Sequence, residues 1–187
     1  MLKDKLKNLI PEMEKLIEYT KIDKMERGFT FRIDKDAKIE EFCQTGSNCQ
    51  IVMNELAKKE GTKTGNFHTH PYTTMKTKIT NAIGGVFSCG DILLQASNNT
   101  DHSCVGTNDE IVCSTIKSRL PFTEKFGLYD CISLHHLMRK RKNEIKEYRG
   151  SEMEKENVKK LNRLETELDR DLRPYFDFEI IENIYEE

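Results

Sequence analysis

The 187-residue sequence has no tryptophan and only four prolines. It has no apolar run close to the roughly 20 residues that a membrane-spanning helix requires. Its first residues, Met1 to Lys5, lack the long apolar core of a secretory signal peptide. The six cysteines include no C-x-x-C pair, which argues against a four-cysteine zinc finger. We therefore expect a cytoplasmic protein with reduced, mostly buried cysteines, and a Cys43–Cys49 disulfide is the alternative.

An excess of either charge is also missing. The chain has 30 basic and 32 acidic residues, and its formal net charge is -2. This balance argues against a general nucleic-acid or membrane-surface binder. The length is enough for one core of about 100–150 residues plus an appendage. We expect a domain over residues 1–120 and a helical extension with a C-terminal tail over residues 121–187.

Hydrophobic spacing predicts the elements of the first domain. Apolar residues at three- and four-residue steps predict an amphipathic helix over 2–19, in which Pro11 either begins a second helix or kinks a single long one. Alternating residues predict a strand at 28–33, a turn at 34–37 and a returning strand at 38–43. Residues 49–53 fit either a strand or a helix, and residues 54–59 favour a helix over 49–59. The sequence then predicts a strand at 63–69, a helix at 88–97 and a hairpin over 102–116.

The C-terminal third is charged and helical in pattern. It predicts a helix from about 124 to 148 and a second over 151–172, which together form a helical hairpin. Ser151 and Glu154 are placed as a capping box for the second helix. Residues 175–181 form either a last strand or an extended tail. The expected fold class is therefore α/β, a mixed, curved sheet flanked by helices, with a C-terminal helical extension.

The most informative stretch runs from residue 66 to 71 and reads N-F-H-T-H-P. Residues two apart in a strand point to the same side, so His68 and His70 form a chelating pair for a borderline metal such as zinc. Asp91 offers a third ligand, and Ser88 lies one helical turn before it. Three protein ligands leave a fourth position for water, which indicates a catalytic rather than a structural zinc site.

The pattern H-x-H-P followed by S-x-x-D resembles the motif of the JAMM (MPN+) metalloproteases. These include deubiquitinating isopeptidases and archaeal and bacterial relatives that act on ubiquitin-like proteins. In that family a glutamate precedes a glycine at the start of an early strand, as Glu26 precedes Gly28 here. The resemblance covers about residues 1–118 and implies a cytidine-deaminase-like layering of helices and sheet. This chain differs in the 16 residues 72–87 before the serine, and Phe87 stands where a proline is common.

The resemblance also implies a role for each residue of the motif. His68, His70 and Asp91 would bind Zn²⁺ as the cofactor, and Ser88 would stabilise the oxyanion of the tetrahedral intermediate. Glu26 would take a proton from a water at the metal and pass it to the leaving amine. Each residue also has an ordinary structural explanation. Two histidines can end a strand, an aspartate suits the first turn of a helix, and a serine caps it.

The glutamate has rivals elsewhere in the chain, because glutamate is abundant in this sequence. We prefer Glu26 because it directly precedes a glycine-led strand. The rivals are Glu40, Glu41, Glu55 and Glu60.

The resulting prediction is a zinc-dependent metallopeptidase or isopeptidase. It would hydrolyse an amide or isopeptide bond in conjugates or precursors of ubiquitin-like proteins, with a protein or peptide as its partner and with no nucleic acid or membrane. The C-terminal helices could form a dimer. Two alternatives stay open. One is a PHP-like metal phosphoesterase, which needs further ligands that only His102, His135 and His136 could supply. The other is a non-catalytic MPN-type scaffold that binds a partner through the helical hairpin.

Overall fold

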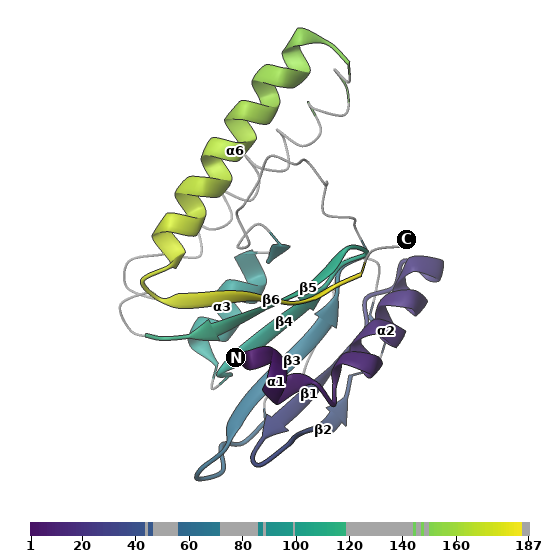
Figure 1. Ribbon diagram of the computed structural model, residues 1–187, viewed down its shortest axis with the longest axis vertical. Coiled ribbons are helices and arrows are strands. Elements are labelled where there is room, and N and C mark those ends of the chain that lie inside the picture. Colours follow the sequence, from purple (N-terminus) through teal and green to yellow (C-terminus); the bar gives the residue numbers. More distant parts are fainter. Residues whose placement is uncertain are drawn as a thin grey trace.

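A six-stranded mixed sheet forms the centre of the computed structural model, with the strand order β2-β1-β3-β4-β5-β6 (Figure 1). The strands are β1 Gly28–Ile33, β2 Ala37–Phe42, β3 Lys63–Thr69, β4 His102–Gly106, β5 Glu110–Ile116 and β6 Phe176–Asn183. Among these strands only β3 and β4 pair in parallel. The structure describes residues 1–43, 45–46, 56–71, 86–87, 89–98, 100–118, 144, 147 and 150–184. The predicted α/β class and mixed sheet are confirmed.

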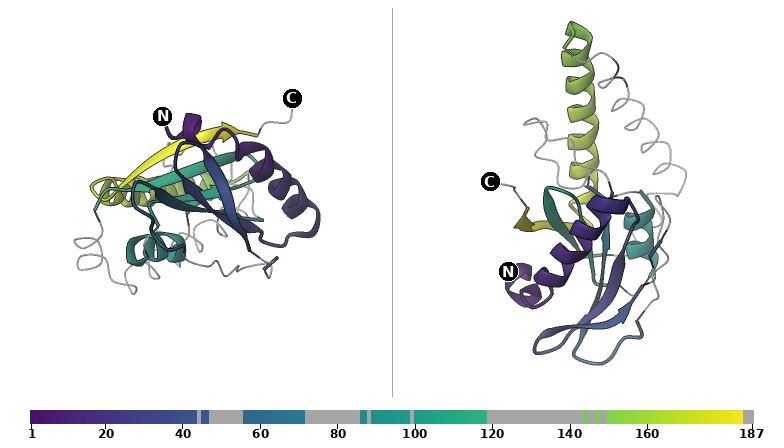
Figure 2. Two further views of the ribbon diagram at one scale, coloured as in Figure 1. Left: turned by 90° about the horizontal axis from the view of Figure 1, so that it is seen from below. Right: turned by 90° about the vertical axis from the view of Figure 1, so that its right-hand side faces the viewer.

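Helices cover both faces of the sheet. The described helices are α1 Leu2–Leu6, α2 Ile10–Asp23, α3 Cys89–Ser97 and α6 Glu152–Leu172. The first two lie on one side and α3 on the other, while α6 extends away from the sheet (Figure 2). Pro11 lies in the first turn of α2. Amide groups of the first turn have no hydrogen-bond acceptor within the helix, so proline, which lacks the amide hydrogen, is tolerated there. It therefore begins a second helix and does not kink a single long one.

Alternation along the strands gives the sheet two buried faces. The face toward α1 and α2 carries a cluster that includes Leu6, Met13, Ile17, Phe29, Phe31, Phe67, Cys104, Ile111, Cys113 and Ile181. The opposite cluster comprises Val86, Phe87, Ile92, Ala96, Val105, Val112, Leu172, Tyr175 and Phe176. His68 pairs in register with Val105, and paired residues point to the same face. His68 therefore projects toward α3.

The C-terminal segment returns to the sheet. The helix α6 begins with the predicted cap, in which the Glu154 amide donates to Ser151 Oγ over 3.3 Å. The Glu154 carboxylate accepts from the amide of Gly150, one residue earlier than in a capping box. The strand β6 then pairs antiparallel with β5, so the strand is the right alternative for the tail. The domain boundary near residue 120 stays a prediction. The helix expected at 124–148 lies outside the described residues except for 144 and 147.

Two expectations differ from the structure. In the helix predicted at 49–59, residues 56–59 have no regular structure, and residues 49–55 lie outside the described part. The cysteines were expected to be reduced, but Cys104 and Cys113 form a disulfide between β4 and β5. The hairpin pairs these two residues directly, with a Cα–Cα distance of 4.0 Å. The Cys43–Cys49 alternative falls outside the described residues.

None of the helices in the described ranges is long and apolar enough to cross a membrane. The cytoplasmic location stays a prediction.

A buried histidine predicts how stability depends on pH. Burial lowers the pKa of His102 from 6.5 to about 4, Asp101 opposes this shift, and Lys63 and Lys5 add to it. Between pH 4 and 6.5 the unfolded chain therefore binds a proton at His102 that the folded protein does not. We expect the free energy of unfolding to fall by about 3 kcal/mol as pH is lowered through this range. Urea unfolding of wild type and His102→Gln at several pH values measures the difference, and parallel pH profiles would contradict it.

Candidate metal centre

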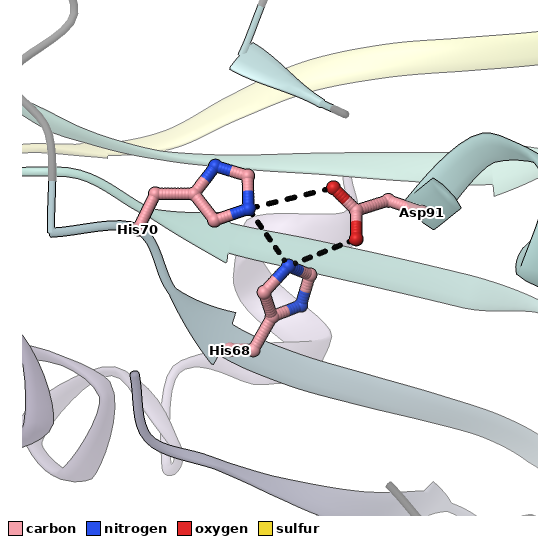
Figure 3. Close-up of side chains that lie close together, drawn as sticks. All are labelled: His68, His70 and Asp91. Carbon is pink, nitrogen blue, oxygen red and sulfur yellow. Dashed lines mark hydrogen bonds and ion pairs between the residues drawn. The ribbon is translucent and has the colours of Figure 1, made fainter. Parts of the chain in front are cut away.

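Two adjacent elements supply the candidate ligands (Figure 3). His68 is in β3, and His70 follows the end of that strand. The His70 amide donates to Gly106 O over 2.8 Å, which continues the pairing with β4 for one more residue. Asp91 comes from the first turn of α3. One ligand atom from each of the three side chains lies within 4.8 Å of the others, so the structure contains a group able to hold a metal ion.

The two histidine nitrogens lie as close together as two ligands of one ion, and each faces a different oxygen of the Asp91 carboxylate. The Nε2 atoms of His68 and His70 are 3.1 Å apart. His68 Nε2 is 3.1 Å from Asp91 Oδ1, and His70 Nε2 is 3.5 Å from Asp91 Oδ2. Tetrahedral zinc with bonds of about 2.0–2.1 Å places neighbouring ligand atoms about 3.3–3.4 Å apart. Two imidazoles and one carboxylate are also a donor set that suits Zn²⁺.

The electrostatics of the group favour a cation. Burial lowers the pKa of His68, but the carboxylates of Asp91 and Glu26 outweigh it, and the pKa rises above its ordinary value. Burial raises the pKa of Asp91, yet His68 and His70 hold it well below its ordinary value. Two carboxylates therefore favour positive charge at the His68 ring. A divalent cation would benefit from the same carboxylates that favour protonation of His68.

A close approach of β1 to β3 brings the segment of Glu26 beside this group. It is 6% exposed and precedes β1, whose first residue Gly28 pairs in register with His68. A Cβ atom at Gly28 would stand 2.3 Å from Phe67 O, so this close approach of the two strands requires glycine. The glycine brings the Glu26 segment against the ligand strand. The carboxylate is close enough to raise the pKa of His68.

The other predicted residues are placed as follows. Ser88 lies outside the described residues, so its position relative to the ligands is not assigned. Among the rival glutamates, Glu40 forms an ion pair with Arg32 at 3.5 Å and Glu60 is exposed. Glu41 is in β2, and Glu55 is outside the described part. The structure thus brings together the three predicted ligands and places the charge of Glu26 near them.

Sequence reasoning missed a glutamine that holds α3. Gln95 is buried one helical turn after Asp91, and its Nε2 donates to the carbonyls of Asp101 and Ser114 over 3.3 and 3.1 Å. The Ser114 hydroxyl donates to Gln95 Oε1. These bonds hold α3 against β4 and β5 and set the depth of Asp91. A polar residue four positions after the aspartate, on the helix face that packs, is the signal that could have revealed it.

Replacing this glutamine should affect both the fold and the metal site. In Gln95→Leu the two carbonyls and the Ser114 hydroxyl lose these hydrogen bonds in a buried setting. We expect a loss of about 1–3 kcal/mol in the free energy of unfolding, together with weaker metal binding. Urea unfolding and zinc titration measure the two effects. Leu94→Gln on the exposed side of the same helix is the control and should change neither. Unchanged metal affinity in Gln95→Leu would contradict its role in placing Asp91.

Comparisons of the chain with protein-family models, curated proteins and solved structures give no match. The resemblance to the JAMM metalloproteases therefore rests on the motif residues alone.

Proposed function

We propose that this protein is a zinc-dependent metallopeptidase or isopeptidase of the JAMM type. The observation that carries the proposal is the grouping of His68, His70 and Asp91, in which one ligand atom from each side chain lies within 4.8 Å of the others. Two imidazoles and one carboxylate are a donor set that suits Zn²⁺. The buried carboxylate of Glu26 contributes to the raised pKa of His68 in the same group. A metal-dependent hydrolase of this type needs such a carboxylate to accept a proton. The parallel unit β3-α3-β4 around the ligands agrees with the proposed JAMM-like layering and curved sheet.

Each residue has a defined task in the proposed reaction. His68, His70 and Asp91 would hold the ion, leaving a fourth position open. Bound Zn²⁺ would supply a Lewis acid that lowers the pKa of water to about 7. Glu26 would accept the proton of the attacking water and transfer it to the leaving amine. The Ser88 hydroxyl would donate to the oxyanion that forms on the substrate carbonyl.

The proposed substrate is an amide or isopeptide bond after the C-terminal tail of a ubiquitin-like protein or a related peptide. This choice rests on the resemblance. The proposed cytoplasmic location rests on the absence of a signal-peptide pattern, and the proposed lack of nucleic-acid and membrane partners rests on the charge balance and the short apolar runs. The proposed dimer through the C-terminal helices rests on the predicted helical hairpin. The phosphoesterase alternative receives less support. His102 is two residues before Cys104 in β4, so the two side chains point to the same face of the sheet, toward α1 and α2. His68 pairs with Val105 and lies on the opposite face. His135 and His136 lie outside the described residues.

The test is cleavage by the zinc-loaded protein. Linear fusions and isopeptide-linked conjugates of ubiquitin-like proteins are incubated with it, with and without a zinc chelator, and products are separated by electrophoresis. We expect cleavage that the chelator abolishes and that added Zn²⁺ restores. A parallel phosphatase screen with Mn²⁺ separates the alternatives. Phosphate release without peptide cleavage would support a phosphoesterase, and bound zinc without either activity would support a scaffold.

A further inference from the structure

Thr69 stands between the two histidine ligands and points away from them. Its side chain is 1% exposed and faces α2, because alternate residues of a strand point to opposite sides. It binds both backbone groups of Arg27. The Thr69 amide donates to Arg27 O over 2.8 Å, and the Arg27 amide donates to Thr69 Oγ1 over 2.9 Å. The ligand strand is thereby joined to the residue that follows Glu26.

A second threonine continues this connection into α2. Thr20 Oγ1 lies 2.7 Å from Thr69 Oγ1 and 2.9 Å from Met25 O. A carbonyl can only accept, so the single hydroxyl hydrogen of Thr20 goes to Met25 O. The Thr69 hydroxyl then donates to Thr20 Oγ1 at 2.7 Å, a shorter contact than the 3.4 Å to its other acceptor, Arg27 O. Its lone pair accepts from the amide of Arg27. The result is a chain of three hydrogen bonds that all run in one direction, from Arg27 N through both hydroxyls to Met25 O.

This chain begins and ends on the two peptide groups that flank Glu26. Met25 O belongs to the peptide before Glu26, and Arg27 N belongs to the peptide after it. Glu26 O itself accepts from the Gly46 amide over 2.9 Å. The strand β1 begins only at Gly28, so the regular ladder does not hold this segment. Its backbone is fixed by the two hydroxyls, by the Thr69 and Gly46 amides, and by two local contacts, from the Arg27 guanidinium to Met25 O and from the Met25 amide to Asp23.

We propose that Thr20 and Thr69, here called the threonine clamp, are positioning residues that hold Glu26 at the metal centre. The catalytic consequence rests on the proposed function. The same residue that separates the two ligands also anchors the segment of the general base. A shift of the ligand strand therefore carries Glu26 with it, and the distance between the base and the ion is preserved. A misplacement of about 1 Å at a reacting group can cost roughly 10²-fold in rate.

The experiment compares Thr69→Val, which keeps the shape but removes the hydroxyl, with Thr69→Ser, which keeps the hydroxyl. Thr30→Val is the matched control, since Thr30 is also buried but touches Glu41 O at 3.4 Å and not the Glu26 segment. We expect Thr69→Val to retain zinc and KM but to lose roughly 10²-fold in kcat. Thr69→Ser and Thr30→Val should stay within about threefold of wild type. In a Glu26→Gln background, Thr69→Val should cause no further loss of kcat.

A second measurement does not depend on activity. Amide hydrogen exchange by NMR should show Arg27 protected in wild type and Thr69→Ser, and exchanging roughly 10-fold faster or more in Thr69→Val. Fast exchange in wild type would overturn the clamp. A protected amide with unchanged kcat in Thr69→Val would overturn its positioning role. A zinc-loaded wild type without hydrolytic activity would refute the proposed function and the catalytic consequence together, and the exchange comparison would still confirm or overturn the clamp.

Discussion

A Glu26→Gln variant is expected to bind zinc at the wild-type stoichiometry and to lose roughly 10²- to 10⁴-fold in kcat. Glutamine has nearly the shape of glutamate but cannot accept the proton of the attacking water. The segment stays in place because its backbone is held by Thr69, Thr20 and Gly46. Steady-state kinetics on an isopeptide-linked substrate, together with elemental analysis of the same samples, measure both quantities.

Glu41→Gln is the matched control for this variant. Glu41 is a rival glutamate in the neighbouring strand β2, opposite Thr30. We expect it to keep wild-type kcat. Retained activity in Glu26→Gln would remove Glu26 from the mechanism. Loss of activity in Glu41→Gln alone would assign the base to the rival residue.

The second large effect is expected in Asp91→Asn. The substitution preserves size but removes the negative charge that faces His68 and His70 at 3.1 and 3.5 Å. Removing one partner of a buried charge pair costs about 3–5 kcal/mol, which corresponds to roughly 10²- to 10⁴-fold in affinity for Zn²⁺. Competition with a chromophoric chelator measures the affinity directly.

Asp101→Asn controls for a general loss of stability. Asp101 is also a buried aspartate, but it accepts from the Thr64 amide and lies near Lys58 and Lys63. We expect this variant to be less stable and to bind Zn²⁺ normally. Equal affinities in Asp91→Asn and wild type would exclude Asp91 as a ligand.

The histidine pair was predictable because its geometry is local, whereas Asp91 was placed with it through the motif. An H-x-H pattern at the end of a strand puts both rings on one side, and the structure confirms it for His68 and His70. The strand at residues 28–33 was predictable because alternation acts within a few residues, whereas two alternatives stayed open for Pro11. Glu26 was preferred among the rivals because it lies two residues before a glycine-led strand, and its role as the base stays a prediction.

The missed features depend on pairing between distant segments. The Cys104–Cys113 disulfide follows from the register of the hairpin, which alternation alone does not set to one residue. Gln95 contacts the carbonyls of Asp101 and Ser114, and the latter is 19 positions away in sequence. In the sequence the signal for this glutamine is its spacing of four residues from Asp91 on the packing face of the predicted helix. The role of a buried polar side chain of this kind can be assigned only when its hydrogen-bond partners are known.

The edge position of β6 was left open for a similar reason. Its alternation fits a strand as well as an extended tail, and only the pairing with β5 decides between them. The threonine clamp is even harder to predict from the sequence. Thr20 and Thr69 are 49 positions apart, and a threonine in a helix or strand is common without such a role.

The zinc content of the purified protein tests whether His68, His70 and Asp91 bind one zinc ion. Wild type and His70→Ala are purified in parallel, reconstituted with Zn²⁺, and analysed by elemental mass spectrometry. We expect about one zinc per wild-type chain and a loss of that zinc in the variant. A wild type that holds no zinc after reconstitution would contradict the proposed zinc site. The two histidines would then be a structural strand end, and the scaffold alternative would replace the enzyme.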